Sequence, residues 1–526
     1  MAFPKLSGMS SDEAFFTEWT HRRPGTRRDL NRARALVTAL HAGVRVPVLT
    51  VVGSKGKGTT ATYASAYLAS TGATVVTVTS PGLRSNRDRI RVNGASISDE
   101  DLASLGSRVT RETLPPSEGY LSPAGLFTIA GILHAQRIRA DFVVLEAGMG
   151  GASDEVSLFP AQVVAVTEIF AEHIGVLGNT VAEIAREKAG VIADETLSVV
   201  SLPQTPEVWS ELSTRAGARL HRIDPQEAPW TRNAILGRTA AAHLTDLRPD
   251  QKPLLPVRLP ARFSHHDIGH TRLIIDSPIS RAGVEMSVQR AVAEWGGIDH
   301  VLLCLPDHKD LDGAIEALNG LPVTFVRLPQ THLNFNGDLP NTWHVTTIDK
   351  VDAAFIENAG NRVLALGTVY FTGHLLDNLD IPTDRLFEYE PMRTAVYRFI
   401  TTSWGVFVQL TARALPQADY VGDTIKITDR VSLALRSYTH YAEIAEQITP
   451  AVRSAATKIE ESLDGDGIVI EVRKITYTET DYQPEGVRAA MDLWLSEEFG
   501  IDLPEMTVHF DKSQKQYVFH WPCDTD

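Results

Sequence analysis

The stretch VVGSKGKGTT at residues 51–60 has the composition of a turn that holds phosphate groups. Its three glycines let the main chain approach phosphate oxygens that a Cβ atom would keep away. Lys57 is placed to neutralise β- and γ-phosphates, and a following threonine hydroxyl can ligate Mg²⁺. The glycines are Gly53, Gly56 and Gly58, and the threonine is Thr59 or Thr60. The spacing departs from the strict P-loop pattern, so an ordinary basic turn is the alternative.

The elements on either side of this loop decide between the two interpretations. VPVLTVVG (46–53) is an apolar run that predicts a buried strand, and TTATYASAYLASTG (59–72) predicts a helix that ends at Gly72. Between a strand and a helix, successive backbone N–H groups and the positive end of the helix dipole face an anion. The setting therefore favours a phosphate-binding loop.

Two further polar residues end predicted strands. Glu146 ends DFVVLEAG (141–148), where an acid can orient Mg²⁺ across from a phosphate loop. Ser80 ends ATVVTVTS (73–80) and can offer its hydroxyl to a second metal ion. The alternatives are a carboxylate in water and a turn residue that precedes a proline.

A histidine and a lysine follow along the chain. His173 comes after the predicted strand QVVAVTEI (162–169), and beside Glu172 it is either a metal ligand or a structural residue. Lys188 lies in the last turn of a helix predicted over 180–190, whose Thr180 and Glu183 form a capping-box pattern and whose Gly190 stands at the C-cap. Since the helix dipole alone favours a cation there, a purely structural lysine is the alternative.

The first half of the chain alternates predicted strands and helices, which indicates a mostly parallel sheet covered on both faces. Strands predicted at 271–278, 300–306 and 361–371 suggest a second, smaller α/β domain. The expected division is 1–245, 255–382 and 388–526.

The last region reads as an extra α+β domain. Its predicted strands are 404–415 and 467–478, and its predicted helices are 450–463 and 484–500, followed by a β-hairpin over 506–521. Thr449 is the expected N-cap of the first of these helices, with Pro450 at its first position.

Composition excludes several classes of protein. The 526 residues carry 50 basic and 65 acidic side chains, and a net charge of −15 disfavours binding to nucleic acid or to an anionic membrane. No apolar run approaches the roughly 20 residues that span a bilayer, and the first residues do not resemble a signal peptide. Cys304 and Cys523, far apart, suggest a reducing compartment. We therefore expect a soluble cytoplasmic protein, in which the basic patch at 21–28 is a solvated helix entrance rather than a phosphate contact.

Several stretches occur in the order of a known family. They are GSKGKGTT (53–60), TVTSPGLRSNRDRIRVNGASIS (77–98), VLEAGMGGASD (144–154), AEHIGVLGNTVAEIAREKAGVI (171–192), LPARF (259–263) and LALGTVYFTGHLL (364–376). Residues from about 25 to 375 thereby resemble folylpolyglutamate synthase and dihydrofolate synthase, within the Mur ligase superfamily. These proteins carry GTNGKGST at the loop, which accounts for its departure from the strict P-loop pattern.

The resemblance implies a chemistry and a set of ligands. ATP would lie on the glycine loop, one Mg²⁺ would be shared by Thr59 and Glu146, and a second would use Glu146, His173 and Ser80. Lys188 would be carbamylated, and Arg262 and Asp276 would reach the nucleotide from the second domain. A substrate carboxylate would take the γ-phosphoryl group, and an amine would attack the acyl phosphate to form an amide.

The chain also departs from the family pattern. DSPISR (276–281) stands where the family has DGAHNP, Gly82 replaces the histidine of TSPH, and Ala152 replaces the arginine of GGRLD. The FE pair that precedes a helix is missing near Ala124-Gly125.

Three functions compete. The leading hypothesis is an ATP-dependent amide ligase that joins a carboxylic acid, folate-like or other, to an amino acid such as glutamate. A noncatalytic nucleotide-binding partner subunit is the alternative from another class. A simple P-loop kinase is disfavoured by the EKAG segment and the second α/β domain.

Overall fold

The computed structural model divides into two compact units, Met1–Tyr389 and Glu390–Asp526, and each is described by itself. The residues that it describes are 12–23, 25–112, 114, 117–225, 229–245, 256–330, 333–388, 392–400, 405–420, 423–435, 441–463, 465, 467–477 and 479–522. Cys523 and part of the basic patch at 21–28 lie outside the described residues, as does the whole stretch between the first two predicted domains.

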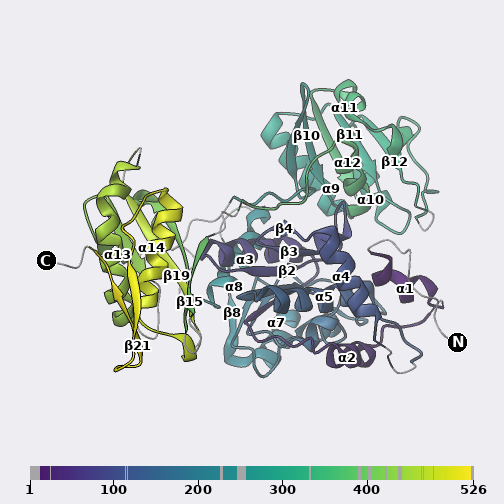
Figure 1. Ribbon diagram of the computed structural model, residues 1–526. Coiled ribbons are helices and arrows are strands. Elements are labelled where there is room, and N and C mark those ends of the chain that lie inside the picture. The colour runs from purple at the N-terminus through teal and green to yellow at the C-terminus, as the bar shows by residue number, and fades with distance from the viewer. Residues whose placement is uncertain are drawn as a thin grey trace. The chain divides into compact units, whose positions relative to one another are not determined.

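An eight-stranded sheet forms the centre of the first unit (Figure 1). Its order is β4-β3-β2-β5-β1-β6-β7-β8, and all the pairs from β2 to β8 are parallel, whereas β3 and β4 are antiparallel. The strands are β1 (Val48–Val52), β2 (Val75–Val78), β3 (Ile90–Val92), β4 (Ala95–Ser96), β5 (Phe142–Glu146), β6 (Val163–Val166), β7 (Ser198–Ser201) and β8 (Leu220–Arg222). The mostly parallel α/β fold that the sequence predicts is confirmed.

Helices cover both faces of this sheet, which is why the central strands are continuous apolar runs. In β1, Val48 and Val52 face one hydrophobic core, and Leu49 and Val51 face the other. Helices α3 (Lys57–Ser70) and α8 (Arg232–Ala242) pack on the second face. The opposite face carries α1 (Glu13–His21), α2 (Leu30–Ala39), α4 (Asp99–Thr110), α5 (Pro123–Ile138), α6 (Val181–Ala189) and α7 (Pro206–Ala216).

The helix caps differ in detail from the predicted ones. Helix α3 is capped by Thr71, one residue before the expected Gly72. At α6 the Thr180 hydroxyl accepts the Glu183 N–H at 3.2 Å, as a capping box requires, but the Glu183 carboxylate accepts the N–H of Asn179 instead of that of Thr180. Gly190 has ordinary helical dihedral angles, with φ −62°, so glycine is not needed there for a left-handed cap.

A second sheet in the same unit has the order β13-β12-β11-β14-β10-β9, with only β9 antiparallel. Its strands are β9 (Ser264–Ile268), β10 (Thr271–Asp276), β11 (His300–Cys304), β12 (Val323–Arg327), β13 (His344–Thr347) and β14 (Arg362–Gly367). Its helices are α9 (Arg281–Trp295), α10 (Leu311–Ala317), α11 (Ala353–Ala359) and α12 (Val369–Asn378). The strand predicted over 361–371 is therefore too long, because Thr368 caps a helix whose Phe371 N–H it accepts at 3.4 Å.

The second unit contains a five-stranded sheet of order β15-β16-β19-β18-β17 and a separate hairpin, β20-β21. The strands are β15 (Arg393–Ile400), β16 (Gly405–Pro416), β17 (Ile425–Lys426), β18 (Val431–Leu435), β19 (Ile468–Tyr477), β20 (Thr507–Asp511) and β21 (Gln516–His520). Helices α13 (Tyr441–Glu461) and α14 (Glu485–Phe499) pack against each other and against this sheet (Figure 1). The prediction that a helix begins at Pro450 is wrong, because α13 starts at Tyr441 and continues through that proline.

Short 3₁₀ helices complete the described elements: η1 (Asn86–Arg89), η2 (Glu155–Leu158), η3 (Gly217–Arg219), η4 (Pro229–Thr231), η5 (Ile348–Lys350), η6 (Gln417–Asp419) and η7 (Glu479–Asp481). Within the described parts of the chain, no helix has both the length and the apolar composition needed to cross a membrane.

Candidate active site

The glycine loop joins β1 to α3, and its backbone requires glycine at two positions. Gly53 has φ 136°, and a Cβ atom there would lie 1.9 Å from Oγ1 of Thr167. Gly56 has φ 84°, and a Cβ atom would lie 2.2 Å from Nδ2 of Asn233. Gly56 is also the N-cap of α3 and supplies no side chain to accept the first N–H groups of the helix. The positive end of α3 is thus left for an anion.

Ser54 and Lys57 hold the loop in place. The Ser54 N–H donates to the Glu168 carbonyl at 2.9 Å, and its hydroxyl accepts the Phe170 N–H at 3.1 Å. Lys57 folds back, and its Nζ donates to the carbonyl oxygens of Gly53 at 3.0 Å and of Ser54 at 3.3 Å. The ammonium group of Lys57 therefore lies over the loop itself.

The two threonines after the lysine differ in their surroundings. The Thr60 hydroxyl is fully buried and donates to the Asn233 carbonyl at 3.1 Å, so it packs α3 on α8. Thr59 lies in the first turn of α3 and is partly exposed. Thr59 is the more exposed of the two, whereas the hydroxyl of Thr60 is already bonded within the protein.

Glu146 ends β5 beside the loop. A Cβ atom on Gly58 would lie 3.4 Å from its Oε2, and that oxygen accepts the Ser80 N–H at 3.0 Å. Burial raises the pKa of Glu146, against the opposing effects of Lys57, the Ser80 N–H, Arg262 and Arg89. The carboxylate is thus costly in its ionised form unless a cation lies next to it.

Arg89 is a site residue that sequence reasoning missed. Its Nη1 donates to the Ser80 hydroxyl at 3.0 Å, and its guanidinium lies 4.8 Å from the ring centre of Phe127. Burial lowers the pKa of Arg89 to about 10. The signal was its place in the RDRI stretch (87–90), which matches the family's ERI segment. The Ser80 hydroxyl oxygen therefore already accepts a hydrogen bond from a cation, which leaves it less available to a metal ion.

Lys188 is fully buried at the end of α6. Its Nζ donates to the carbonyls of Gly53 at 3.0 Å and Met149 at 2.9 Å, and it pairs with Glu172 at 2.8 Å. Burial lowers the pKa of Lys188, although Glu172 opposes this. All three neighbours are acceptors, which match the three donors of an ammonium group.

His173 belongs to this lysine group. It has φ 49°, and its Nε2 lies 3.9 Å from the Glu172 carboxylate. The joint binding of a second metal ion by Glu146, His173 and Ser80 stays a prediction.

The second sheet contributes charged residues to the same region. Arg262 bonds the Ala261 carbonyl, and its charge acts on Glu146. The Asp276 carboxylate is occupied locally: it accepts the N–H groups of Phe263 and Ser277 and the Ser287 hydroxyl.

Lys55 connects the two sheets of this unit. Its Nζ donates to the Ser280 hydroxyl at 3.3 Å, and burial lowers the pKa of Lys55, while Glu172 and Asp276 oppose this and Lys309 adds to it. Lys55 and Lys309 were not selected from the sequence, since isolated lysines carry no pattern. Together they add positive charge close to the loop.

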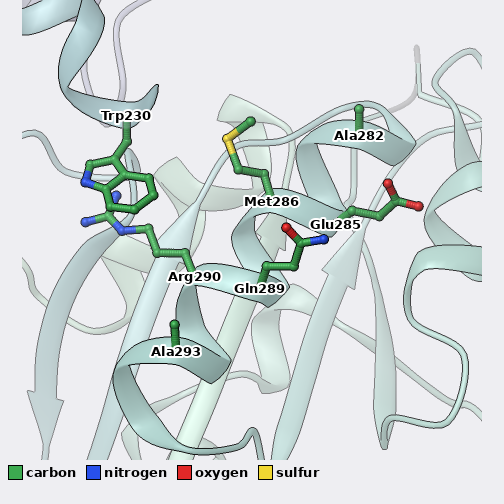
Figure 2. Close-up of a pocket in the computed structure, with 7 residues that line it drawn as sticks. All are labelled: Trp230, Ala282, Glu285, Met286, Gln289, Arg290 and Ala293. Carbon is green, nitrogen blue, oxygen red and sulfur yellow. The ribbon is translucent and has the colours of Figure 1, made fainter. Parts of the chain in front are cut away.

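A hollow of about 340 Å³ lies between η4 and α9 (Figure 2). The Arg290 guanidinium stacks over the Trp230 ring at 4.9 Å, and Met286 lines the same hollow. Trp230 is only three residues from Asn233, which touches the glycine loop.

The donor set fits a single hard cation rather than a preformed cage. Among the described residues, no three histidine, cysteine or acidic side chains are gathered as metal ligands. Mg²⁺ is commonly held by one or two carboxylates together with substrate phosphates. The buried Glu146 beside Gly58 and the partly exposed Thr59 satisfy that requirement.

The fold resembles that of folylpolyglutamate synthases of known structure. Among solved structures, a folylpolyglutamate synthase from Thermotoga maritima matches 71% of this chain and 97% of its own, with a TM-score of 0.57 and 19% identity. A Mycobacterium tuberculosis folylpolyglutamate synthase in complex with ADP and AMPPCP matches 67% of this chain and 95% of its own, with a TM-score of 0.57 and 20% identity.

Sequence comparison supports the same relationship. Dihydrofolate synthase/folylpolyglutamate synthase of Bacillus subtilis is 34% identical over 196 residues, which is 36% of this chain and 45% of that protein. The Escherichia coli protein of the same name is 30% identical over 197 residues, 37% of this chain and 46% of that protein. The chain thus spans about half the length of the curated relatives it matches, and no family model matches it. The resemblance to the folylpolyglutamate synthase/dihydrofolate synthase family is confirmed.

Proposed function

We propose that this protein is an ATP-dependent ligase that forms an amide through an acyl phosphate. One observation carries the proposal: the open N-terminus of α3 and the glycine loop lie directly beside the buried carboxylate of Glu146. A magnesium–triphosphate needs both kinds of group at one place: N–H groups that bind the phosphates and a carboxylate that binds the metal ion.

ATP and a divalent metal are the cofactors in this proposal. A relative from Yersinia pestis has been solved with AMPPNP and a Mn ion. Here Gly53, Ser54, Gly56, Lys57, Gly58 and Thr59 would line the phosphates, and Thr59 and Glu146 would hold the metal. The metal, when bound, would neutralise phosphate charge. The hollow beside Trp230 is where we place the nucleotide's base, since an exposed indole offers a stacking surface.

The protein's own cations would serve the chemical step. Lys57, Arg262 and Arg89 surround Glu146, so the negative charge that moves during phosphoryl transfer would be met by fixed positive groups. The substrate carboxylate oxygen would form a bond to the γ-phosphorus as the bond to ADP breaks. The amine would then attack the acyl carbon, release phosphate and lose its proton. Asp276 and Lys188 would act by holding the main chain around the site: Asp276 binds N–H groups of the second sheet, and Lys188 binds carbonyls of the glycine loop and of the loop after Glu146.

The substrates are an acid and an amino acid in this proposal, with a folate-type acid and glutamate suggested by the names of the relatives. The glycine at position 82, where the family carries a histidine, is a reason to test carboxylic acids other than folates. A Cβ atom there would lie 2.3 Å from the Ser85 carbonyl oxygen, so the histidine that the family carries at this position does not fit this backbone. Because the reaction consumes ATP, a cytoplasmic location is part of the proposal.

The decisive experiment measures ADP and amide formation by the purified full chain. ATP, Mg²⁺ and a panel of acids, including dihydropteroate and tetrahydrofolate, would be combined with a panel of amino acids. Lys57→Ala should remove a charge-assisted contact worth about 1.5–3 kcal/mol and abolish turnover. Lys350→Ala, at an exposed position, is the matched control.

The outcomes separate the competing functions. ADP formation that depends on an acid supports the ligase. ATP binding by calorimetry with no ADP for any acid would favour the noncatalytic partner subunit. Normal ATP hydrolysis by the Lys57 variant would contradict the role of the loop.

A further inference from the structure

A buried charged network lies at the start of α5, where the chain lacks the family's FE acid. Position 125 is glycine, and a Cβ atom there would lie 2.1 Å from Cδ of Glu155 and 2.2 Å from its Oε1. The Glu155 carboxylate therefore occupies the space above position 125. An acid is present at this place, but it comes from a different segment of the chain.

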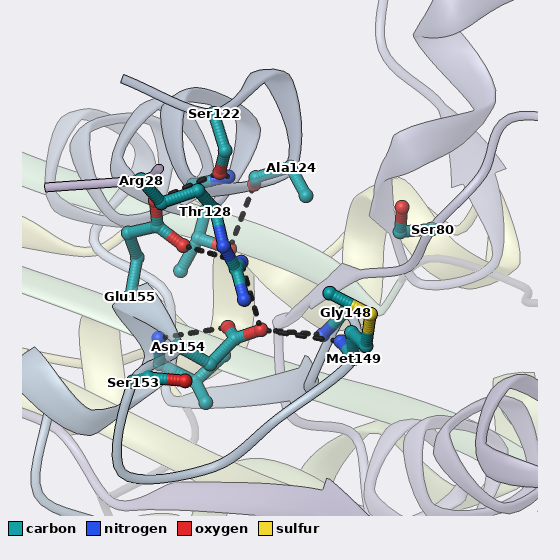
Figure 3. A network of polar contacts seen from close by, with 12 residues as sticks. Arg28, Ser80, Ser122, Ala124, Thr128, Gly148, Met149, Ser153, Asp154 and Glu155 are labelled. Carbon is teal, nitrogen blue, oxygen red and sulfur yellow. Dashed lines mark hydrogen bonds and ion pairs between the residues drawn. The ribbon is translucent and has the colours of Figure 1, made fainter. Parts of the chain in front are cut away.

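The carboxylate of Glu155 is fully engaged there (Figure 3). Its Oε1 accepts the Ser122 hydroxyl at 2.7 Å, and its Oε2 pairs with Nη1 of Arg28 at 3.3 Å. Glu155 is 2% exposed. Arg28 had been interpreted as part of a solvated basic patch, but its guanidinium points inward to two acids.

The second of these acids connects the network to the loop after Glu146. Asp154 pairs with Arg28 at 3.4 Å, and its Oδ2 accepts the N–H groups of Gly148 at 3.1 Å and Met149 at 3.3 Å (Figure 3). The Met149 carbonyl in turn accepts the ammonium of Lys188, which also donates to Gly53 of the glycine loop. A continuous chain of contacts thus runs from Glu155 to the glycine loop.

We propose that Glu155 is a positioning residue, whose carboxylate fills the space above position 125. Through Arg28 and Asp154 it holds the loop that follows Glu146 in place. The kinetic part of this inference rests on the proposed ligase function, whereas the structural part does not. Supporting residues of this kind commonly change activity by about 10–100-fold when removed.

The test removes the carboxylate of Glu155 and fills its space from position 125. Glu155→Ala, Gly125→Glu and the double variant would be compared in the full chain, with the exposed Glu207→Ala as control. Glu155→Gln keeps an acceptor for Ser122 and removes the charge that faces Arg28. Two readouts are needed: hydrogen exchange at the Gly148 and Met149 amides, and kcat and KM for acid-dependent ADP formation.

We expect Glu155→Ala to speed exchange at these amides at least tenfold and to lower kcat, with KM for ATP changed less than kcat. Gly125→Glu alone should be impaired, because its Cβ atom would overlap the carboxyl group of Glu155, and the double variant should be less impaired than Gly125→Glu alone. Unchanged exchange in Glu155→Ala, or a double variant no better than Gly125→Glu, would overturn the inference. If Glu155→Ala does not fold, unchanged exchange in Glu155→Gln overturns it equally.

The exchange readout needs no turnover. A wild-type chain that forms no ADP with any acid would count against the proposed function, while the amides of residues 148 and 149 would still decide the role of Glu155.

Discussion

The ammonium of Lys188 donates to the carbonyl of Gly53 at 3.0 Å, although the two residues are 135 positions apart in the chain. This contact joins the end of α6 to the glycine loop. The same Nζ binds the Met149 carbonyl and Glu172, so one buried cation connects three segments that end at the carboxyl edge of the sheet. Lys188 thus holds these three segments together at the site.

Replacing this lysine should be severe. Lys188→Met keeps the volume but leaves Glu172 without its partner and two carbonyls without a donor. Leaving buried carbonyls without a donor costs about 1–3 kcal/mol, and we expect a loss of that size in the free energy of unfolding. Urea unfolding measures it, with the exposed Lys350→Met as control. A loss below about 1 kcal/mol would show that the three contacts contribute little.

The glycine loop gives a second prediction. Gly56→Ala must accommodate φ 84° and a Cβ atom 2.2 Å from the Asn233 amide. We expect a loss of at least about 1 kcal/mol of stability, from the strained backbone alone, together with loss of ATP binding. Gly43→Ala is the control, since its Cβ would meet nothing within 4 Å and its φ is not positive. Calorimetric titration with ATP and Mg²⁺ measures the binding, and wild-type affinity in Gly56→Ala would contradict the phosphate-loop role.

The sequence was sufficient where a local pattern carries the information. The apolar runs at 48–52, 142–146 and 163–166 are strands because only a doubly covered sheet buries such runs. Glu146 ends an apolar strand and Lys188 lies in the last turn of a capped helix, as the local patterns predict. The functional role expected for Lys188 rests on the family resemblance and stays a prediction.

Contacts between distant segments could not be predicted. Nothing near Arg28 indicates that it pairs with Asp154 and Glu155, more than 120 positions away. Thr60 looked equivalent to Thr59 until the packing of α8 placed the Asn233 carbonyl against its hydroxyl. Tertiary packing determines which partner each of these side chains contacts, and a single sequence does not show that packing.

Pro450 shows packing overriding a local rule and gives a third prediction. Its apolar neighbours Ile444, Ile448, Val452 and Ile459 continue one buried face of α13 across the proline. Proline has no N–H for the carbonyl four residues earlier, so Pro450→Ala should restore one helical hydrogen bond. We expect the second unit to gain about 2 kcal/mol, since the penalty of about 3 kcal/mol is partly offset by a freer unfolded chain.

Scanning calorimetry of the full chain measures this gain as a shift of the transition of the second unit. Pro484→Ala is the control, because Pro484 is the N-cap of α14, where the helix needs no N–H from this residue. A lower transition temperature in Pro450→Ala would mean that the helix depends on the proline ring for packing.

The carboxyl group of Glu146 gives a prediction about pH. Because burial raises its pKa above the usual 4.5, the folded protein holds this proton more tightly than the unfolded chain does. Ionisation of Glu146 therefore costs folding free energy. The cost is absent below pH 4.5 and grows by roughly 1.4 kcal/mol for each pH unit up to the pKa of the folded state.

Glu146→Gln removes this ionisation without changing the shape of the side chain. In metal-free buffer we expect the variant to be more stable than the wild type at pH 7.5 and equally stable at pH 4. Added Mg²⁺ should stabilise the wild type at pH 7.5 and leave the variant unchanged, because only the carboxylate attracts the cation. Urea unfolding at the two pH values, with and without Mg²⁺, provides all four comparisons. Two outcomes would contradict this account of Glu146: a variant that is less stable than the wild type at pH 7.5, or a variant that Mg²⁺ stabilises as strongly as the wild type. Either would show that ionised Glu146 does not destabilise the metal-free fold or does not bind the cation.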